Sequence, residues 1–153
     1  QDWFGGGMDV TPSKIDINEK KEFHKILRNM CNRHNKKYYK KYKKWCDEYF
    51  YLPHRKEARG IGGIFFDYKK DNFEKDFKFV RDVGITFQII FNRIIRKKLK
   101  KKWTINDKEI QYIKRGRYTE FNLLYDRGTK FGLHTGGNVE GILMSLPPLA
   151  KWK

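Results

Sequence analysis

The sequence predicts an α+β fold in which amphipathic helices are interleaved with antiparallel hairpin strands. Residues 18–34, 37–51 and 71–99 repeat apolar side chains at the 3.6-residue spacing of a helix with one buried face. Residues 118–125 instead alternate with a period of two, which is typical of a strand. No GxGxxG motif opens a helix, so the pattern does not indicate a doubly wound parallel sheet.

The N-terminal stretch joins three glycines to an acidic residue. Residues 3–7 are expected to be a strand end whose glycines let a ligand approach the backbone closely. Asp9 follows, either as a ligand-facing carboxylate or as a turn or cap residue. The first helix is expected to have Asn18 as its N-cap and Glu22 in its first turn. The side chains expected on its buried stripe are Phe23, Ile26, Leu27, Met30 and Cys31.

The middle of the chain predicts two more helices around a charged loop. The second helix turns aromatic residues toward the core and ends near Pro53. Residues 54–60 then carry Arg55 and Arg59, which either point into one cavity or are ordinary surface arginines. The third helix is expected to break at Gly84. Its expected buried residues are Phe73, Phe77, Val80, Phe87, Ile90, Ile94 and Ile95.

The C-terminal third predicts a short helix followed by strands. Thr104 is the expected N-cap of a helix that leads to Arg115. The strand through Tyr125 is expected to stop at the turn formed by residues 126–128, and residues 131–135 are its expected return. A third strand over residues 139–146 is expected to end at the two prolines that follow it.

Composition limits the classes of protein that the chain represents. A length of 153 residues predicts one domain, and no apolar run reaches the roughly 20 residues that span a bilayer. Cys31 and Cys46 have no CxxC spacing and are expected to be reduced, buried thiols. A net charge of +17 is compatible with a nucleic-acid binder, a solvated lysine-rich face or an acidic small substrate.

Five blocks in order carry a family resemblance. They are WFGGGMDVTP from Trp3, YKKWCDEYF from Tyr42 with HR at His54, RGIGGIFFD from Arg59, RGRYTEFNLLYDRGTKFGL from Arg115 and ILMSLPP from Ile142. Together they resemble oxygen-dependent coproporphyrinogen III oxidases. The resemblance covers nearly all of this chain but only the C-terminal part of the enzyme. Residues 1–153 are therefore expected to be a single domain of this type without its N-terminal part, and inactive as an isolated fragment.

The resemblance implies a fold and an activity. It implies a broad antiparallel β-sheet sandwiched between layers of α-helices. It implies the oxidative decarboxylation of two propionates of coproporphyrinogen III to vinyl groups, which gives protoporphyrinogen IX in haem biosynthesis. The implied partners are the tetrapyrrole and a second copy of the chain, without nucleic acid or a membrane span. A cytoplasmic location is expected, with a mitochondrial or plastid-type organelle as the alternative in a eukaryote.

The resemblance also implies the substrate site. Asp9 would accept the converging pyrrole N–H groups and assist deprotonation, because one carboxylate offers about four acceptor sites. Arg55 and Arg59 would bind propionates through their guanidinium groups. The element formed by Gly136, Gly137 and Asn138 would contact the substrate too, although many members carry arginine where this chain has Asn138.

Cofactor and interface expectations complete the prediction. Dioxygen is the expected co-substrate, and no nucleotide, flavin or haem cofactor is expected. The sequence leaves open whether a divalent metal binds, with His24 and His54 as the candidate ligands. The alternative for His24 is a packed, hydrogen-bonded histidine in the core. The dimer interface is expected to include Tyr118, Phe121, Leu123, Leu133, Ile142 and Met144. The rival interpretation is a basic non-catalytic module that binds nucleic acid or serves assembly.

Overall fold

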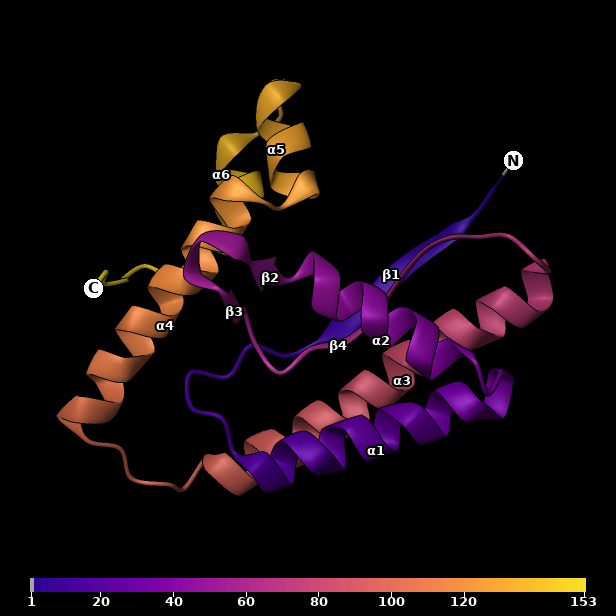
Figure 1. Ribbon diagram of the computed structural model, residues 1–153, viewed down its shortest axis with the longest axis horizontal. Coiled ribbons are helices and arrows are strands. Elements are labelled where there is room, and N and C mark those ends of the chain that lie inside the picture. Colours follow the sequence, from indigo (N-terminus) through magenta and orange to yellow (C-terminus); the bar gives the residue numbers. More distant parts are fainter. Residues whose placement is uncertain (1) are drawn as a thin grey trace. The chain divides into compact units, whose positions relative to one another are not determined.

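A computed structural model describes residues 2–153, which fall into two compact units divided between Lys102 and Trp103 (Figure 1). Helices make up 61% of the chain and strands 11%. The α+β class holds, but the broad sheet implied by the resemblance is wrong for these residues. Two small antiparallel sheets take its place.

The first unit contains both sheets. Strand β1 (Phe4–Asp9) pairs antiparallel with β4 (Gly63–Lys69), so that Met8 lies opposite Ile64 and Asp9 opposite Gly63. The short strands β2 (Tyr51–Leu52) and β3 (Glu57–Ala58) form the second pair, joined through the 3-10 turn Pro53–Arg55. This hairpin replaces the expected loop and turns the chain back toward β1.

Three helices enclose the core of the first unit: α1 (Ile17–His34), α2 (Tyr38–Tyr49) and α3 (Phe73–Lys98). Figure 1 shows α1 running alongside α3. Asp16, rather than Asn18, caps α1, because its carboxylate accepts the N–H groups of Asn18 and Glu19 at 2.9 and 3.1 Å. The core cluster is formed by Met8, Phe23, Leu27, Met30, Cys31, Tyr39, Tyr42, Ile61, Ile64, Phe66, Phe79, Val83 and Ile90. Cys31 and Cys46 are free and buried, as predicted.

Helix α3 departs from the prediction in two ways. It runs through Gly84 without a break, because a helix tolerates an isolated glycine at a cost of about 1 kcal/mol. Its buried residues are Asp76, Phe79, Val83, Thr86 and Ile90. The expected core residues Phe73, Phe77, Phe87 and Ile95 are exposed, because apolar side chains lie on more than one face of this helix.

The second unit is helical where strands were predicted. Its elements are α4 (Ile105–Leu124), α5 (Arg127–His134) and α6 (Val139–Leu143). Thr104 caps α4 as predicted, in a reciprocal capping box with Asp107. The helix does not end near Arg115, however, and continues through the expected strand as far as Leu124.

The predicted turn and returning strands are wrong for a local reason. The Asp126 carboxylate accepts the N–H of Thr129 at 2.7 Å, so the predicted turn is the N-cap of α5. In the same way, Asn138 accepts the N–H of Gly141 at 3.2 Å and caps α6 in place of the third strand. Asp and Asn are common both in tight turns and at helix N-caps. Their presence in the sequence therefore did not distinguish a turn between strands from the start of a helix.

Candidate active site

One face of β1 is nearly bare and ends in a carboxylate. Along the strand, Gly6 and Met8 face Phe66 and the core, and Met8 is only 2% exposed. Gly5, Gly7 and Asp9 alternate with them and therefore share the opposite face. Gly5 and Gly7 are exposed on this face, where the Asp67 carboxylate and the Trp3 ring lie close to Gly5, and Asp9 stands at its end.

The Asp9 carboxylate is paired with Arg59. Nη2 of Arg59 donates a hydrogen bond to Oδ2 of Asp9 at 2.5 Å. The Arg59 side chain is 8% exposed and that of Asp9 24% exposed, so the pair lies mostly out of water with the carboxylate at the open side. Such charge-assisted bonds are the stronger class of hydrogen bond.

Phe50 holds Arg59 from a second direction. The guanidinium carbon of Arg59 lies 3.9 Å from the centre of the Phe50 ring, in cation–π geometry. The backbone N–H of Arg59 also donates to the carbonyl of Phe50 at 2.9 Å. The β2–β3 hairpin makes this contact possible, because it returns the chain to the end of α2.

Two glycines allow the Arg59 segment to run against β1. A Cβ at Gly60 would lie 2.3 Å from the carbonyl oxygen of Val10, and one at Gly63 would lie 1.9 Å from that of Met8. Between them, the N–H of Ile61 donates to the carbonyl of Val10 at 3.0 Å. Only glycine fits these approaches, so the RGIGG block serves the placement of Arg59 beside Asp9.

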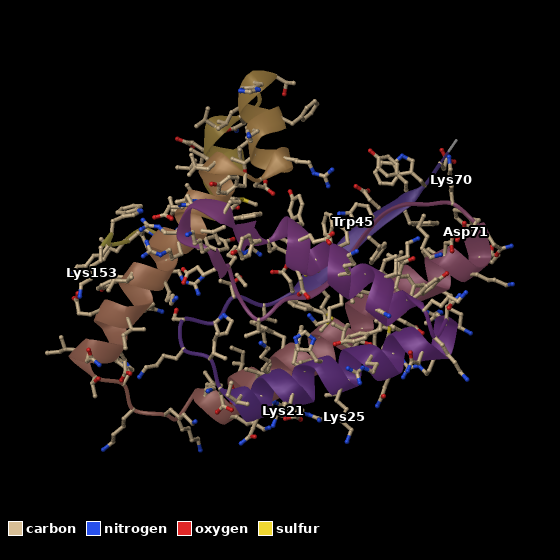
Figure 2. The ribbon with its side chains drawn as sticks, in the orientation of Figure 1. Lys21, Lys25, Trp45, Lys70, Asp71 and Lys153 are labelled. Carbon is tan, nitrogen blue, oxygen red and sulfur yellow. The ribbon has the colours of Figure 1, made fainter. Side chains whose placement is uncertain are left out.

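An aromatic cluster borders the bare strand face. A Cβ at Gly7 would lie 3.0 Å from the Phe65 ring, which places Phe65 on this face. Tyr49 stacks on Phe65 at 4.8 Å between ring centres, and Trp45 meets it edge-on at 5.6 Å. Figure 2 labels Trp45 on α2, the helix that packs against β4. The rings are half-buried, so the site joins an apolar wall to a charged pair.

Cys46 is a buried thiol close to this pair. Burial raises the pKa of the Cys46 thiol to about 12, and the negative charges of Asp9 and Asp47 add to that increase. The thiol therefore stays protonated near neutral pH. This environment favours the neutral thiol of Cys46 over the thiolate that would act as a nucleophile or bind a metal.

The two predicted metal ligands have different surroundings. His24 is buried, its Nε2 donates to the carbonyl of Ile61 at 2.8 Å, and its Nδ1 accepts from the hydroxyl of Tyr39 at 3.1 Å. His54 lies exposed in the 3-10 turn. Within residues 2–153, no three histidine, cysteine, aspartate or glutamate side chains converge on a common point. A metal at His24 would first have to displace one of its two hydrogen bonds.

The remaining predicted site residues have mixed settings. Arg55 is half-buried in the 3-10 turn that leads to Arg59. Gly136, Gly137 and Asn138 link α5 to α6 in the second unit, where Gly136 has a φ of +71° and the Asn138 side chain acts as a cap. Their contact with a substrate stays a prediction.

The predicted interface residues also lie in the second unit. Leu123, Leu133 and Met144 are exposed, Tyr118 and Ile142 are half-buried, and Phe121 is fully buried. A buried Phe121 cannot touch a partner without rearrangement. The dimer itself stays a prediction.

Sequence reasoning assigned Phe50 to the core and gave Phe65 no role. The signal was present in the IFFD run, because in a strand its two phenylalanines must face opposite sides. Phe66 enters the core, and Phe65 therefore faces the glycine side.

None of the helices in the part of the chain that the structure describes is long and apolar enough to cross a bilayer.

Comparisons with known proteins agree on one family. The family model described as Coproporphyrinogen III oxidase matches residues 1–153. The chain is 58% identical over 151 residues to the oxygen-dependent coproporphyrinogen-III oxidase of Rickettsia rickettsii (strain Sheila Smith), covering 98% of this chain and 54% of that protein. It is 57% identical over 153 residues to the enzyme of the same name from Rickettsia bellii (strain OSU 85-389), covering 99% and 55%. The chain thus spans about half the length of the curated relatives it matches.

Proposed function

The chain belongs to the coproporphyrinogen III oxidase family, and on this basis we propose that it supplies the substrate-binding carboxylate of an oxygen-dependent coproporphyrinogen III oxidase. The single observation that carries the proposal is the Asp9–Arg59 pair at the end of a strand face bared by glycines. This arrangement suits a broad ligand with hydrogen-bond donors at its centre and carboxylates at its rim.

The proposed reaction converts a propionate to a vinyl group. Each conversion breaks the bond between the carboxyl carbon and its neighbour, releases carbon dioxide and removes one hydrogen from the carbon next to the ring. Two electrons leave the substrate, and dioxygen, which the relatives' name requires, takes them up with two protons as hydrogen peroxide. Two such steps convert coproporphyrinogen III to protoporphyrinogen IX.

Asp9 is proposed to act on the pyrroles. Four pyrrole N–H groups converge at the centre of the substrate, and a carboxylate has about four lone-pair positions to receive them. Loss of one pyrrole proton to Asp9 would make the ring electron-rich and ready for attack by oxygen. Its pairing with Arg59 fixes the direction of the carboxylate before the substrate arrives.

The arginines are proposed to hold propionates. Arg59, whose guanidinium is already ordered beside Asp9, would bind one propionate, because the planar guanidinium matches the geometry of a carboxylate. Arg55, in the turn that precedes Arg59, would bind a second propionate. The segment of Gly136, Gly137 and Asn138 would add a weaker, uncharged contact.

The family resemblance supports three further proposals. They are a divalent metal held by His24 and His54, a homodimer and a cytoplasmic location.

The binding step can be tested on the chain itself with coproporphyrin III, the stable oxidised form of the substrate. Titration monitored by tryptophan fluorescence should give saturable 1:1 quenching that persists at high salt, because a shaped pocket and not only charge holds the ligand. Asp9→Asn should weaken binding by about tenfold, the loss of one charge-assisted hydrogen bond. Multiple-site binding that disappears as salt rises, with nucleic acid competing, would instead support a basic binding module.

A further inference from the structure

The groove between α1 and α2 has a large surplus of positive charge. It consists of two adjoining hollows of about 780 and 530 Å³, which share Arg28, Tyr39 and Lys43 in their walls. Five lysine and arginine side chains line each hollow. Figure 2 shows Lys21 and Lys25, two residues of the smaller hollow, on the outward side of α1. The volumes are within the usual range for small-molecule sites.

Acidic side chains offset only part of this charge, which leaves a surplus of three positive charges in the lining of the larger hollow and five in that of the smaller one. The smaller hollow has none in its lining, and the larger has Asp47 and Glu48 at one end. Each is already in an ion pair with the lysine one helical turn earlier, Lys43 and Lys44. The electrostatic potential in the groove therefore favours a ligand with several negative charges.

The floor of the groove is rigid. Tyr39 is 7% exposed and donates its hydroxyl to Nδ1 of His24, whose Nε2 donates to the carbonyl of Ile61. Burial lowers the pKa of His24, against the opposing effect of the Ile61 hydrogen bond, so the ring is neutral and both bonds persist at neutral pH. The floor therefore keeps its shape when the groove is empty.

The floor of the groove does not suit the binding of single-stranded nucleic acid. The guanidinium carbon of Arg28 lies 4.8 Å from the centre of the Tyr39 ring, and the ring is buried. No base can stack on it, although stacking on aromatic rings is how proteins hold single-stranded nucleic acid. The exposed lysines around this floor suit a compact anion, because an ammonium group on a flexible stem neutralises charge without requiring the planar geometry that arginine prefers.

We propose that the α1–α2 groove is a binding site for a compact polyanion that carries several carboxylate or phosphate groups. The site is formed by residues other than Asp9, Arg55 and Arg59, and the proposal does not depend on the function of that site. Arg28 lines both hollows, whereas Lys25 lines the smaller and Lys40 the larger, so these three side chains together represent the whole site.

The test uses two probes, inorganic tripolyphosphate and benzene hexacarboxylate, titrated calorimetrically into the full chain at about 20 mM salt, where surface charge is screened least. Either probe should bind with 1:1 stoichiometry. The triple variant Lys25→Gln, Arg28→Gln, Lys40→Gln should weaken binding by at least about tenfold, because three charged contacts are lost. The relative affinities of the two probes distinguish phosphate from carboxylate as the natural group.

The matched control removes the same charge elsewhere. Lys75→Gln, Lys78→Gln, Lys100→Gln lowers the net charge by three at exposed positions outside the groove and should change the affinity by less than about twofold. Circular dichroism confirms that both triple variants are folded. The proposal would be overturned if the two triple variants weakened binding equally, or if the unmodified chain showed no saturable binding of either probe. It would also be overturned if an RNA oligonucleotide bound more tightly than the probes, with several protein molecules on each RNA strand.

Discussion

At the scale of single residues, Arg59 shows how the site is prepared before a substrate binds. Its guanidinium lies on the Phe50 ring, its Nη2 bonds to Asp9, and its backbone N–H bonds to the Phe50 carbonyl. A long side chain that is already ordered loses less conformational entropy when a ligand arrives. Phe50 is thus a positioning residue for the charged pair rather than a contact for the reacting atoms.

The Phe50 contact can be measured by a double-mutant cycle. Phe50→Leu and Arg59→Met, singly and together, should give a coupling energy of about 0.5–2 kcal/mol in urea unfolding, because Leu has no ring face for the guanidinium. Phe50→Tyr keeps the ring and should keep most of that coupling. Additive effects of Phe50→Leu and Arg59→Met would contradict the role assigned to Phe50.

His24 makes stability depend on pH. Burial holds the folded-state pKa of His24 below its ordinary value of about 6.5, so as pH falls the unfolded chain binds a proton that the folded chain does not. The contribution of the neutral His24 ring to the free energy of unfolding is therefore fully present above about pH 6.5. It is lost as pH falls toward the lower folded-state pKa, with a slope of at most about 1.4 kcal/mol per pH unit.

Urea unfolding at pH 7.5, 6.5 and 5.5 measures this loss directly. His24→Gln keeps an amide N–H that can donate toward the Ile61 carbonyl but removes the titration, so the part of the slope due to His24 should disappear. His134→Gln, at an exposed position, is the matched control for losing a histidine. An identical slope in the original chain and in His24→Gln would contradict the prediction.

At the scale of elements, two glycines in different settings should respond oppositely to alanine. Gly84 lies inside α3 with open space where a Cβ would stand, so Gly84→Ala should raise the unfolding free energy by about 0.5–1 kcal/mol. A Cβ at Gly63 would lie 1.9 Å from the Met8 carbonyl oxygen, so Gly63→Ala should lower the unfolding free energy by more than about 2 kcal/mol. Urea denaturation tests both, and equal effects would contradict the geometry.

Elements with one clear apolar stripe were predictable from the sequence, and those with mixed patterns were not. The first helix was correct to within two residues, because its apolar positions allow only a 3.6-residue period: its cap is Asp16 where Asn18 was expected, and it ends at His34 as predicted. Residues 118–125 fit either period, and their helical contacts became visible only in the structure. These include the Arg117–Glu120 ion pair at 3.2 Å and the hydrogen bond from Thr119 Oγ1 to the Arg115 carbonyl at 3.0 Å.

The site could be predicted only in part for a related reason. The family resemblance indicated Asp9, Arg55 and Arg59 as site residues, whereas the local pattern left Asp9 open as a turn or cap residue and the arginines open as surface residues. The contact between Asp9 and Arg59 depends on the hairpin of β2 and β3, whose strands have two residues each, and on Gly60 and Gly63 fitting against β1 and the residue that follows it. Such long-range packing is not encoded in local periodicity, so the role of Phe50 was missed.

At the scale of the whole molecule, apolar surface remains open on the first unit. Seven large apolar side chains of α3 are between 37% and 63% exposed: Phe73, Phe77, Ile85, Phe87, Ile89, Phe91 and Ile95. The sheet of β1 and β4 has only two strands, and a two-stranded sheet depends on packing for its stability. Large exposed apolar side chains in this number along one helix favour contact with a further part of a protein. These features agree with a chain that spans about half the length of its relatives.

The 153 residues alone are therefore expected not to turn over coproporphyrinogen III. In the proposed reaction, Asp9, the bound propionate and dioxygen must be held together out of water, whereas the charged pair is open on the Asp9 side, where 24% of that side chain is exposed. Catalytic groups that act as a unit lose most of their effect when any of them is absent. The assay incubates the purified chain with coproporphyrinogen III and oxygen, then quantifies protoporphyrin after oxidation, with a Rickettsia relative as the positive control. Turnover at a rate comparable to that relative would show that Asp9, Arg55 and Arg59 suffice without the additional length of the relatives.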